Sequence, residues 1–364
     1  MKNDNPRYKI LITPTSIKPD SNSPAIATLR TFAHELVFNP TGKPLAGREL
    51  IELLEGCDGV IAGLDDYSAE VINATCTAGS TGFAGSADSA VFIDATDATG
   101  SADSTVSAGS PHPGIGRLKV ISRYGSGYDN IDLAAARANG VKICCTPGAN
   151  AESVADLAFG LMLCLARRLP ALDRKTKSGE WTRSIGIELF GKTIGIVGLG
   201  AVGKGVVKRA GGFSMRVLAY EVAPDIGYAK ANNIALVSFD ELIRASDIIS
   251  LHIPLTSDTY HIINREVISR MKPGALLINT ARGGLLDETA AYDALVSGRL
   301  GGLGLDAYEE EPPKSSPLFS LDNVVLTPHT GSHTADATAN LAEMSVRNLI
   351  DILSGRPCKY IINC

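Results

Sequence analysis

The sequence predicts an α/β protein built from doubly wound parallel sheets. Short apolar runs rich in Val, Ile and Leu alternate with helix-length segments, which is the pattern of parallel strands joined by crossover helices. A GxGxxG turn lies mid-chain, between one such run and the next helical segment. The chain has 364 residues and 45% hydrophobic content, which favours two domains over one.

Composition excludes several classes of function. The formal net charge of -5 and a pI near 5.7, with Lys and Arg scattered along the chain, argue against nucleic-acid binding. The N-terminus lacks the apolar core of a signal peptide, and the longest strongly apolar run, 157–166, is about half of a membrane span, so we expect a cytoplasmic protein. Seven cysteines without a CxxC pair fit neither a disulfide framework nor a metal site.

The first third of the chain predicts the opening elements of a sheet. Strands are expected at 8–14 and 58–63, and helices at 47–55 and 68–73. Residues 74–116 consist mostly of Ala, Ser, Thr, Gly and Asp, so we interpret them as an insertion that is disordered or peripheral. Within it, 90–95 has the composition of a short strand.

The alternation resumes at Leu118 and continues to the end of the chain. Strands are expected at 118–125, 141–148, 191–198, 216–221, 248–254, 275–281, 303–308 and 323–329. Helices are expected at 133–139, 151–168, from 201, at 240–247, at 264–271 and before 295. Apolar positions cover most of the circumference of 151–168, so this helix is expected to be buried within the chain, between domains or against a second subunit.

The glycine turn predicts a dinucleotide site. In GIVGLGAVGK, Gly198 permits the tight turn, Gly200 lets the backbone approach a pyrophosphate, and Gly203 lets helix and strand pack closely. Roughly 20 residues later, the carboxylate of Glu221 ends the next strand, where it would bond the ribose hydroxyls and repel a 2′-phosphate. FAD proteins usually carry the same turn near the N-terminus. We therefore predict NAD.

Three polar residues predict an active site for hydride transfer. Arg282 in NTARGG, Glu311 in EEEP and His329 in TPHTG each follow a predicted strand, where ligands bind in open α/β sheets. An arginine can bind a carboxylate through two hydrogen bonds, and a histidine oriented by a carboxylate can donate or accept a proton. Glu309 and Glu310 are alternative carboxylates. His252 is interpreted as structural or as a modest cofactor contact, and His34, His112 and His261 have no supporting context.

From Leu118 onward the chain resembles the D-isomer-specific 2-hydroxyacid dehydrogenases, and among them the short D-3-phosphoglycerate dehydrogenases. The resemblance rests on ISRYGSGYDNID, GANAESVADLAFGLML, GKTIGIVGLGAVGK, LHIPLT, MKPGALLINTARGG, LDAYEEEPP and NVVLTPHTGSHT. It implies Arg282 as the substrate-binding and polarising arginine, Glu311 as its carboxylate partner and His329 as the proton donor.

The resemblance also implies further contacts, residue by residue. Expected cofactor contacts are Ala201 and Val202 at the pyrophosphate, Glu221 at the ribose, Thr280 and Ala281 at the nicotinamide ribose, Ile253 and Pro254 at the adenine, Asp306 at the carboxamide, and Ser126. Expected substrate contacts are the amides of Tyr124 and Gly125, together with Arg282.

Two positions bear on the substrate. Arg123 matches an arginine on the substrate side of the phosphoglycerate enzymes and is expected near a phosphate, whereas IAGLDD lacks the second arginine that some of them carry. His333 stands where the family usually has a small residue, and we interpret it as an outward-facing residue or a second titrating group near the site.

The family pattern implies a discontinuous, flavodoxin-like substrate-binding domain, 1–148 with 330–364, and a Rossmann NAD-binding domain at 149–329. A final helix near 341–353 would return to the first domain, with hinges near Gly148 and Thr330, and the helix after Asn150 would pair two subunits into a dimer. Because the sequence ends about 35 residues after His329, no amino-acid-sensing regulatory domain is expected.

The favoured function is NAD-dependent oxidation of 3-phosphoglycerate in serine biosynthesis. Reduction of glyoxylate or hydroxypyruvate is the alternative within the same chemistry. A noncatalytic NAD-sensing scaffold, similar to the corepressors of this fold, is the alternative of another class, since such proteins can retain the three polar residues.

Overall fold

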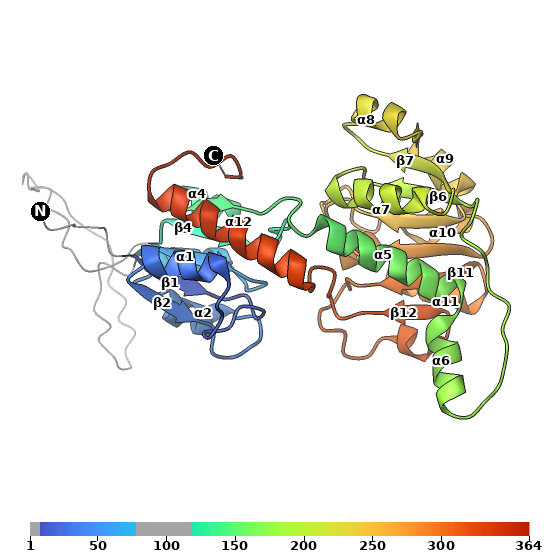
Figure 1. Cartoon of the computed structure of the whole chain (residues 1–364), viewed down its shortest axis with the longest axis horizontal. Coiled ribbons are helices and arrows are strands. Elements are labelled where there is room, and N and C mark those ends of the chain that lie inside the picture. The colour runs from blue at the N-terminus through green and yellow to red at the C-terminus, as the bar shows by residue number, and fades with distance from the viewer. Residues whose placement is uncertain (1–7, 78–117, 364) are drawn as a thin grey trace, which may run out of the picture.

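The computed structural model describes residues 8–77 and 118–363 and contains two parallel sheets (Figure 1). The first sheet has five strands in the order β2-β1-β3-β4-β5, which is the flavodoxin-like order. Its strands are β1 (Lys9–Ile12), β2 (Glu35–Phe38), β3 (Gly59–Ala62), β4 (Val120–Arg123) and β5 (Lys142–Cys144). All of their pairings are parallel.

The second sheet has seven strands in the order β12-β11-β10-β9-β6-β7-β8. Its strands are β6 (Thr193–Val197), β7 (Arg216–Tyr220), β8 (Ala235–Leu236), β9 (Ile248–Leu251), β10 (Ala275–Asn279), β11 (Leu300–Leu305) and β12 (Val324–Leu326). The strand order reverses between β6 and β9, as in the dinucleotide-binding fold. The predicted fold class, two doubly wound parallel sheets, is confirmed.

Helices cover both sheets. Those beside the first sheet are α1 (Pro24–Phe32), α2 (Gly47–Leu54), α3 (Ala69–Thr77), α4 (Leu133–Ala138) and α12 (Ala335–Leu353). Those beside the second sheet are α5 (Ala151–Ala166), α6 (Leu169–Lys177), α7 (Ala201–Gly211), α8 (Ile226–Ala231), α9 (Phe239–Ala245), α10 (Arg265–Arg270) and α11 (Glu288–Val296). Two short 3-10 turns lie at Gly283–Leu285 and Pro317–Ser320.

The last helix returns to the first sheet. Helix α12 packs on β3, β4 and α1, and the hydroxyl of Ser122 donates to the carbonyl of Ser345 over 2.8 Å. After α12 the chain runs along β5, where the amide of Ile362 donates to the carbonyl of Ile143 over 2.9 Å. Figure 1 shows the red α12 lying across the blue and cyan strands.

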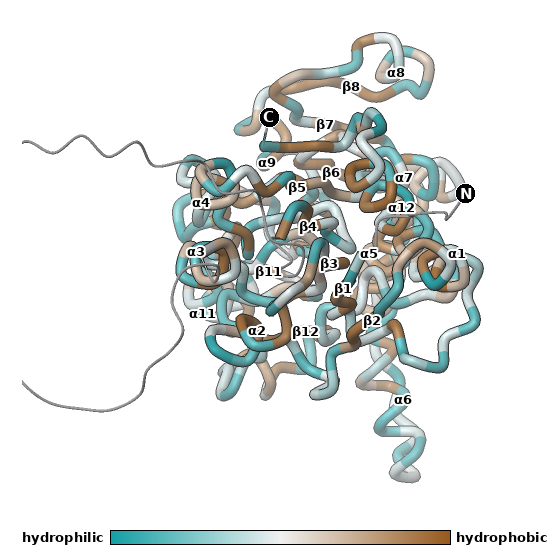
Figure 2. Tube along the Cα trace, turned by 90° about the vertical axis from the view of Figure 1, so that its left-hand side faces the viewer, coloured by the Kyte–Doolittle hydropathy of each residue, from teal (hydrophilic) through white to brown (hydrophobic). Residues whose placement is uncertain are grey.

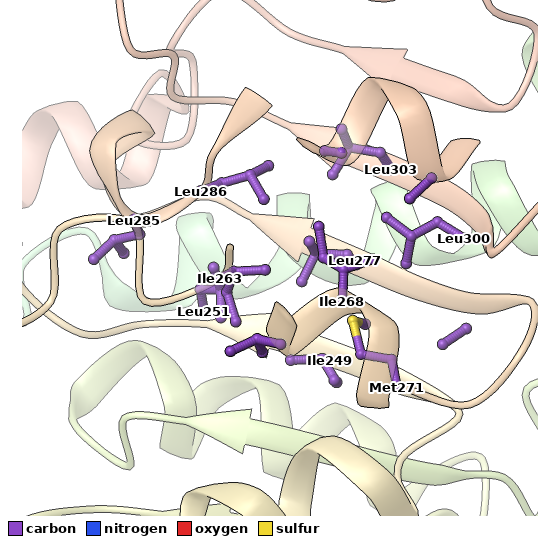
Figure 3. Packing of buried hydrophobic residues seen from close by; sticks show 14 of the residues in the cluster. Ile249, Leu251, Ile263, Ile268, Met271, Leu277, Leu285, Leu286, Leu300 and Leu303 are labelled. Atoms are coloured by element: carbon purple, nitrogen blue, oxygen red, sulfur yellow. The ribbon is translucent and has the colours of Figure 1, made fainter. Parts of the chain in front are cut away.

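The strands form because their side chains are buried on both faces. Every residue of β3, β4, β9 and β10 is buried, as expected of parallel strands covered by helices on both sides. Ile249, Leu277 and Leu303 bring three adjacent strands into one core with Met271 at the end of α10 (Figure 3). Figure 2 shows the contrast between hydrophobic strands such as β1 and the paler, more polar α6.

Side-chain caps define where many helices begin. The residue before the first turn accepts a hydrogen bond from a backbone amide of that turn at Ser23, Asp132, Asp225, Ser238, Asn264, Asp287 and Thr334. Such caps satisfy amides that have no partner within the helix, and each stabilises the helix by about 1 kcal/mol.

The structure corrects several predicted elements. Helix α3 continues to Thr77, past the predicted end at 73, and α12 begins at Ala335, before the predicted start at 341. Strand β11 begins at Leu300, also earlier than predicted. The sequence analysis missed α1, β2, α6, α8 and β8. Most of the predicted insertion, including 90–95, lies outside the described residues.

Helix α5 is covered largely by its own chain. It packs on α7, β10 and β11, and ten of its residues, among them Ala155, Ala158 and Met162, are buried. Of the three environments expected for this helix, burial within its own chain therefore explains most of its buried residues. Within 8–77 and 118–363, no helix is both long enough and apolar enough to cross a bilayer.

Close packing at Gly195 gives a first testable prediction. A Cβ atom on this β6 residue would lie 2.4 Å from Ser246 Oγ and 2.5 Å from Leu242 Cδ2. We expect Gly195→Ala to lower the free energy of unfolding by ~1–3 kcal/mol because it overpacks the interface with α9. Gly211→Ala is the control, since nothing lies within 4 Å of its Cβ position in α7. Equal melting temperatures for the two variants in thermal unfolding would contradict the prediction.

Candidate active site

The carboxyl ends of both sheets face a single cleft with a volume of about 860 Å³. Loops after β1, β3 and β4 line one side, and loops after β9, β10, β11 and β12 line the other. Because parallel strands end at the same edge, side chains far apart in the sequence meet there. The cleft is lined by Arg282, Glu311 and His329 together.

His329 and Glu311 form a hydrogen-bonded pair across the ends of β12 and β11. The Nδ1 atom of His329 lies 2.7 Å from Oε2 and 2.9 Å from Oε1 of Glu311, and the backbone amide of Tyr308 donates to Oε1 over 3.0 Å. Burial raises the pKa of the Glu311 carboxyl. The hydrogen bond from His329 and its charge, the Tyr308 amide and the charge of Arg282 outweigh burial and hold this pKa below its usual value.

The three neighbouring glutamates have different partners. Glu309 pairs with Nε2 of His261, whose ring stacks on Tyr260 with centroids 4.0 Å apart. Glu310 pairs with Lys314 on the surface over 3.3 Å. Glu311 therefore provides the carboxylate that contacts His329 in this structure.

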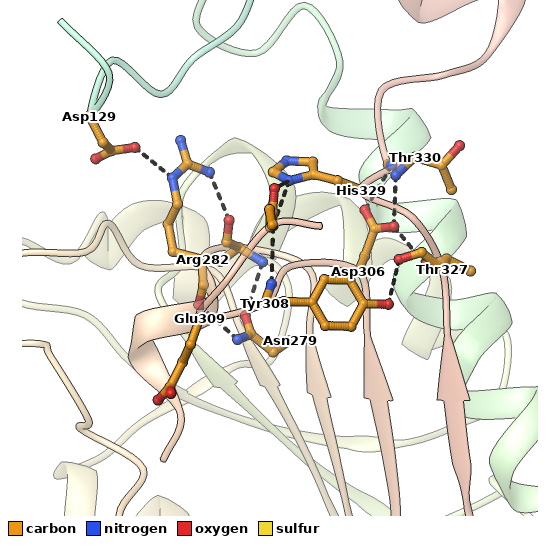
Figure 4. A network of polar contacts seen from close by, with 12 residues as sticks. Asp129, Asn279, Arg282, Asp306, Tyr308, Glu309, Thr327, His329 and Thr330 are labelled. Carbon is orange, nitrogen blue, oxygen red and sulfur yellow. Dashed lines mark hydrogen bonds and ion pairs between the residues drawn. The ribbon is translucent and has the colours of Figure 1, made fainter. Parts of the chain in front are cut away.

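Arg282 is held from two directions (Figure 4). Its Nε donates to Asp129 Oδ2 over 2.6 Å, and its Nη1 donates to the carbonyl of Ala281 over 2.7 Å. The backbone before it is fixed by Asn279, a fully buried residue whose side chain accepts from the Ala281 amide and donates to the Arg282 carbonyl. A Cβ on Gly127 would lie 1.3 Å from Arg282 Nη2, so the guanidinium occupies space that only a glycine leaves free.

Asp306 supports the turn that carries His329. Its buried carboxylate accepts from the hydroxyl of Thr327 over 2.6 Å and from the amides of Thr330 and Gly331 over 2.7 and 2.8 Å (Figure 4). The resemblance implied a contact with the nicotinamide carboxamide. In this structure the carboxylate accepts its hydrogen bonds from the Thr327 side chain and from the backbone after His329.

The glycine turn has the geometry that a dinucleotide requires. Gly198 has φ +98, and a Cβ there would lie 2.7 Å from the His252 carbonyl oxygen. A Cβ on Gly203 would lie 2.2 Å from the Gly198 carbonyl oxygen, whereas nothing lies within 4 Å of the Cβ position of Gly200. Gly200 precedes the first turn of α7, so Ala201 and Val202 place their amides at this open end.

Glu221 lies beside this turn, at the end of β7. Its carboxylate accepts from the amides of Leu199 and Ala223 over 2.8 and 3.2 Å, which holds it at the position expected for a ribose contact.

Six predicted cofactor residues line the cleft that also contains Arg282 and His329. They are Ser126, Val202, Ile253, Pro254, Thr280 and Ala281. The hydroxyl oxygen of Thr280 is buried and has no hydrogen-bond partner among the described residues, so a bound polar group could satisfy it. The open glycine turn and this unpaired hydroxyl fit NAD, which the residues listed above would hold.

The backbone amides of Tyr124 and Gly125 have partners within the chain. The Tyr124 amide donates to the Ala62 carbonyl over 2.9 Å, and the Gly125 amide donates to Thr146 Oγ1 over 2.9 Å. Both amides are therefore engaged within the chain and are not free to receive a substrate carboxylate in this conformation.

Arg123 lies beneath the same loop, with 6% of its surface exposed. Its Nη1 donates to the carbonyls of Ala62 and Tyr124, and its guanidinium lies against Gly125. Burial, together with the nearby charge of Arg282, lowers the pKa of Arg123 to about 10, so it remains charged at neutral pH. Its position suits it to hold the loop from below.

Two further histidines border the cleft. His252 is half-buried and bonds Ser250 Oγ over 2.9 Å, and desolvation lowers its pKa to about 4, so it is neutral. His333 is exposed, and it lines the cleft with Ser16 and Tyr124 rather than facing away. His34 bonds the Tyr8 carbonyl away from the cleft, and His112 lies outside the described residues.

Sequence reasoning missed Asp129 and Asn279. Asp129 lies within the quoted segment YGSGYDNID, and Asn279 directly precedes the TARGG residues. Polar residues inside segments already identified as functional were the available signal.

Comparison with known proteins finds relatives that are dehydrogenases and reductases of 2-hydroxy and 2-oxo acids. The family model of the D-isomer specific 2-hydroxyacid dehydrogenase NAD binding domain matches residues 159–331. A D-3-phosphoglycerate dehydrogenase of Methanocaldococcus jannaschii is 44% identical over 68% of this chain, which spans about half (48%) of that relative. A glyoxylate reductase of Thermococcus litoralis is 42% identical over 68% of this chain and 77% of its own length.

The fold has solved counterparts as well. A crystal structure of a putative D-isomer specific 2-hydroxyacid dehydrogenase from Polaromonas superposes with a TM-score of 0.80 at 26% identity. The match covers 98% of this chain and 100% of that one.

The lowered pKa of Glu311 predicts a pH-dependent stability. A carboxyl whose pKa is lower in the folded state stabilises the protein above its unfolded pKa of about 4.3, and this contribution is lost as the pH falls through the folded pKa. We expect wild type to be more stable than Glu311→Gln at pH 7, and the difference to shrink below about pH 4.3.

Urea unfolding at both pH values measures the difference. Glu310→Gln is the control and should follow wild type, because its carboxylate pairs on the surface. A difference in the free energy of unfolding between wild type and Glu311→Gln that stayed constant with pH would contradict the prediction.

Proposed function

We propose, since the chain belongs to the D-isomer-specific 2-hydroxyacid dehydrogenase family, that it transfers a hydride between NAD and a short D-2-hydroxy or 2-oxo acid. The observation that carries the proposal is that the His329–Glu311 pair and Arg282 line the same cleft as Val202 at the start of α7. An acid for the carbonyl oxygen, a cation for the carboxylate and a cofactor site are thereby within one space.

The residues of the chain would divide the work as follows. When bound, NADH would supply the hydride. Arg282 binds the carboxylate of the acid and stabilises the charge that develops on the carbonyl oxygen. The Nε2 of protonated His329 donates a proton to that oxygen, while Nδ1 keeps its bond to Glu311 and so fixes the ring. In the oxidative direction neutral Nε2 accepts the hydroxyl proton.

We also propose that the cleft separates a substrate-binding domain, 1–148 with 330–364, from an NAD-binding domain, 149–329. The packing of α12 on β3 and β4 supports the return of the chain to the first domain. The positive φ of Gly148 (+78) supports a hinge there, since glycine accommodates such angles. Closure of the cleft would exclude water from the reacting groups.

For the substrate, the geometry favours glyoxylate or hydroxypyruvate over 3-phosphoglycerate. The phosphorylated substrate depends on Arg123 as a phosphate contact, but that guanidinium is buried and bonded to backbone carbonyls. The neighbouring Leu64 supplies no charge. 3-Phosphoglycerate remains the second candidate because Arg123 borders the cleft beside Arg282. Turnover of any of these acids would exclude a purely noncatalytic scaffold.

A homodimer is proposed from the surface around α6. Trp181, Ile185 and Phe190, in the segment after this helix, are 84%, 92% and 68% exposed, and Leu169 on α6 is 48% exposed. Large apolar side chains gathered in one exposed segment are typical of an interaction site. Figure 1 shows α6 and this segment projecting from the second sheet, so a second copy could cover them.

Steady-state oxidation of NADH tests the substrate assignment. We expect the specificity constants for glyoxylate or hydroxypyruvate to exceed that for 3-phosphohydroxypyruvate by about tenfold or more, equivalent to ~1.4 kcal/mol. His329→Gln should have a kcat lower than that of wild type by ~10²–10⁴-fold and should still bind NADH, because only proton transfer is removed. A preference for the phosphorylated acid that Arg123→Lys abolished would restore the serine-pathway substrate. No turnover of any acid would favour the scaffold.

Light scattering after size exclusion tests the dimer. Wild type should elute with twice the chain mass, and Trp181→Ser with Ile185→Ser should elute as a monomer, since apolar contact area is lost. Val296→Ser, which removes an apolar side chain 61% exposed on α11, is the control and should remain dimeric. A monomeric wild type would refute the dimer.

A further inference from the structure

The guanidinium of Arg282 is bonded by a carboxylate that comes from the other sheet. Asp129 belongs to the loop after β4, and Arg282 follows β10. Both side chains line the cleft; Asp129 is exposed (48%) and Arg282 is half-buried (30% exposed). Figure 4 shows Asp129 reaching the Nε side of the arginine while His329 lies on the far side of the guanidinium.

The hydrogen bonds of Arg282 leave one edge of its guanidinium free. An arginine has five N–H groups. The Nε–H goes to Asp129, and one N–H of Nη1 goes to the Ala281 carbonyl. No group in 8–77 or 118–363 accepts a hydrogen bond from the other N–H groups of Arg282, so these can meet the two oxygens of a planar acid.

We propose that Asp129 is a positioning residue for Arg282, an assignment that rests on the proposed function. Its carboxylate fixes the Nε end of the guanidinium, so the Nη edge is presented to the carboxylate and carbonyl oxygens of the substrate. Because Asp129 lies on the loop that carries Gly125 and Ser126, it also couples the arginine to the opposite wall of the cleft.

Two observations separate this pair from an ordinary surface ion pair. Exposed pairs contribute only about 0–1 kcal/mol and tolerate many geometries. Here Arg282 Nη2 fills the Cβ position of Gly127, two residues before Asp129, so the loop is shaped to the arginine. In addition, Asn279 and the Ala281 carbonyl fix the arginine from its own side. The guanidinium thus has a single orientation set from both sheets.

A carboxylate in a cleft for anions would otherwise oppose binding. Paired with Arg282, Asp129 cancels one positive charge, so it lowers the general attraction for anions. Its presence is explained if orientation of the Nη edge matters more than charge. Asp129→Asn keeps an acceptor for Nε–H and loses the charge, whereas Asp129→Ala loses both.

A double-mutant cycle tests the coupling. Asp129→Ala should lower kcat/KM for the best 2-oxo acid by about tenfold or more. Asp129→Asn should lower kcat/KM less than Asp129→Ala does, because the acceptor for Nε–H remains. Arg282→Lys should cost much less in the Asp129→Ala background than in wild type, since lysine lacks the Nε–H and the fork. Additive losses would overturn the proposal.

Asp293→Ala is the matched control. It removes an Arg–Asp pair with Arg265 between α10 and α11, away from the cleft, and should leave kcat/KM unchanged. Melting temperatures of all variants show whether folding is affected.

Binding of oxalate to the complex with NADH gives a readout that does not need turnover. Calorimetry should show weaker oxalate binding in Asp129→Ala, with unchanged NADH binding. If wild type turned over no acid, the proposed reaction would fail, while weaker oxalate binding in the variant would still support the positioning role. Equal oxalate affinity in the variant and wild type, or no oxalate binding to wild type, would overturn it.

Discussion

The hydrogen bonding of the Asp306 carboxylate is the interaction on which the position of His329 in the cleft depends. His329 has a positive φ (+48), which a residue other than glycine adopts rarely and at a cost. The three hydrogen bonds that Asp306 accepts from Thr327, Thr330 and Gly331 hold the chain on both sides of this turn. Buried carboxylates are stable when hydrogen-bonded in this way, so the turn and the carboxylate stabilise each other.

A chain of hydrogen bonds connects this turn to the end of β11. His329 bonds Glu311, whose other contact is the amide of Tyr308, and the Tyr308 hydroxyl donates back to the Thr327 carbonyl over 2.7 Å. The ends of β11 and β12 are thereby linked through backbone as well as side chains. A histidine held by such a network loses little freedom when substrate binds, which is the condition for efficient proton transfer.

The sequence allowed the fold class and the polar residues of the cleft to be predicted, but not their depth or partners. The buried apolar strands and the glycine turn follow from periodicity and local motifs. Strand β2 was missed because it has only four residues and none of them is fully buried, so its apolar pattern is weak. Helix α6 was missed because it has no buried residues and therefore no apolar stripe. The burial of Arg123 depends on how Gly125 folds over it, and the Arg282–Asp129 pair joins residues 153 positions apart. Neither relation has a local signal.

The path of the last thirty residues sets an order for folding. Strands β6 to β12 and their helices form one continuous stretch, so the second sheet can complete its core as soon as that stretch has left the ribosome. The first sheet cannot, because α12 covers β3 and β4, and the segment after it pairs with β5. During synthesis, the apolar face formed by residues such as Ile61 and Val120, which α1 covers only in part, therefore stays exposed beside a folded neighbour until α12 has been made. Chaperones would be expected to meet this protein at its first sheet.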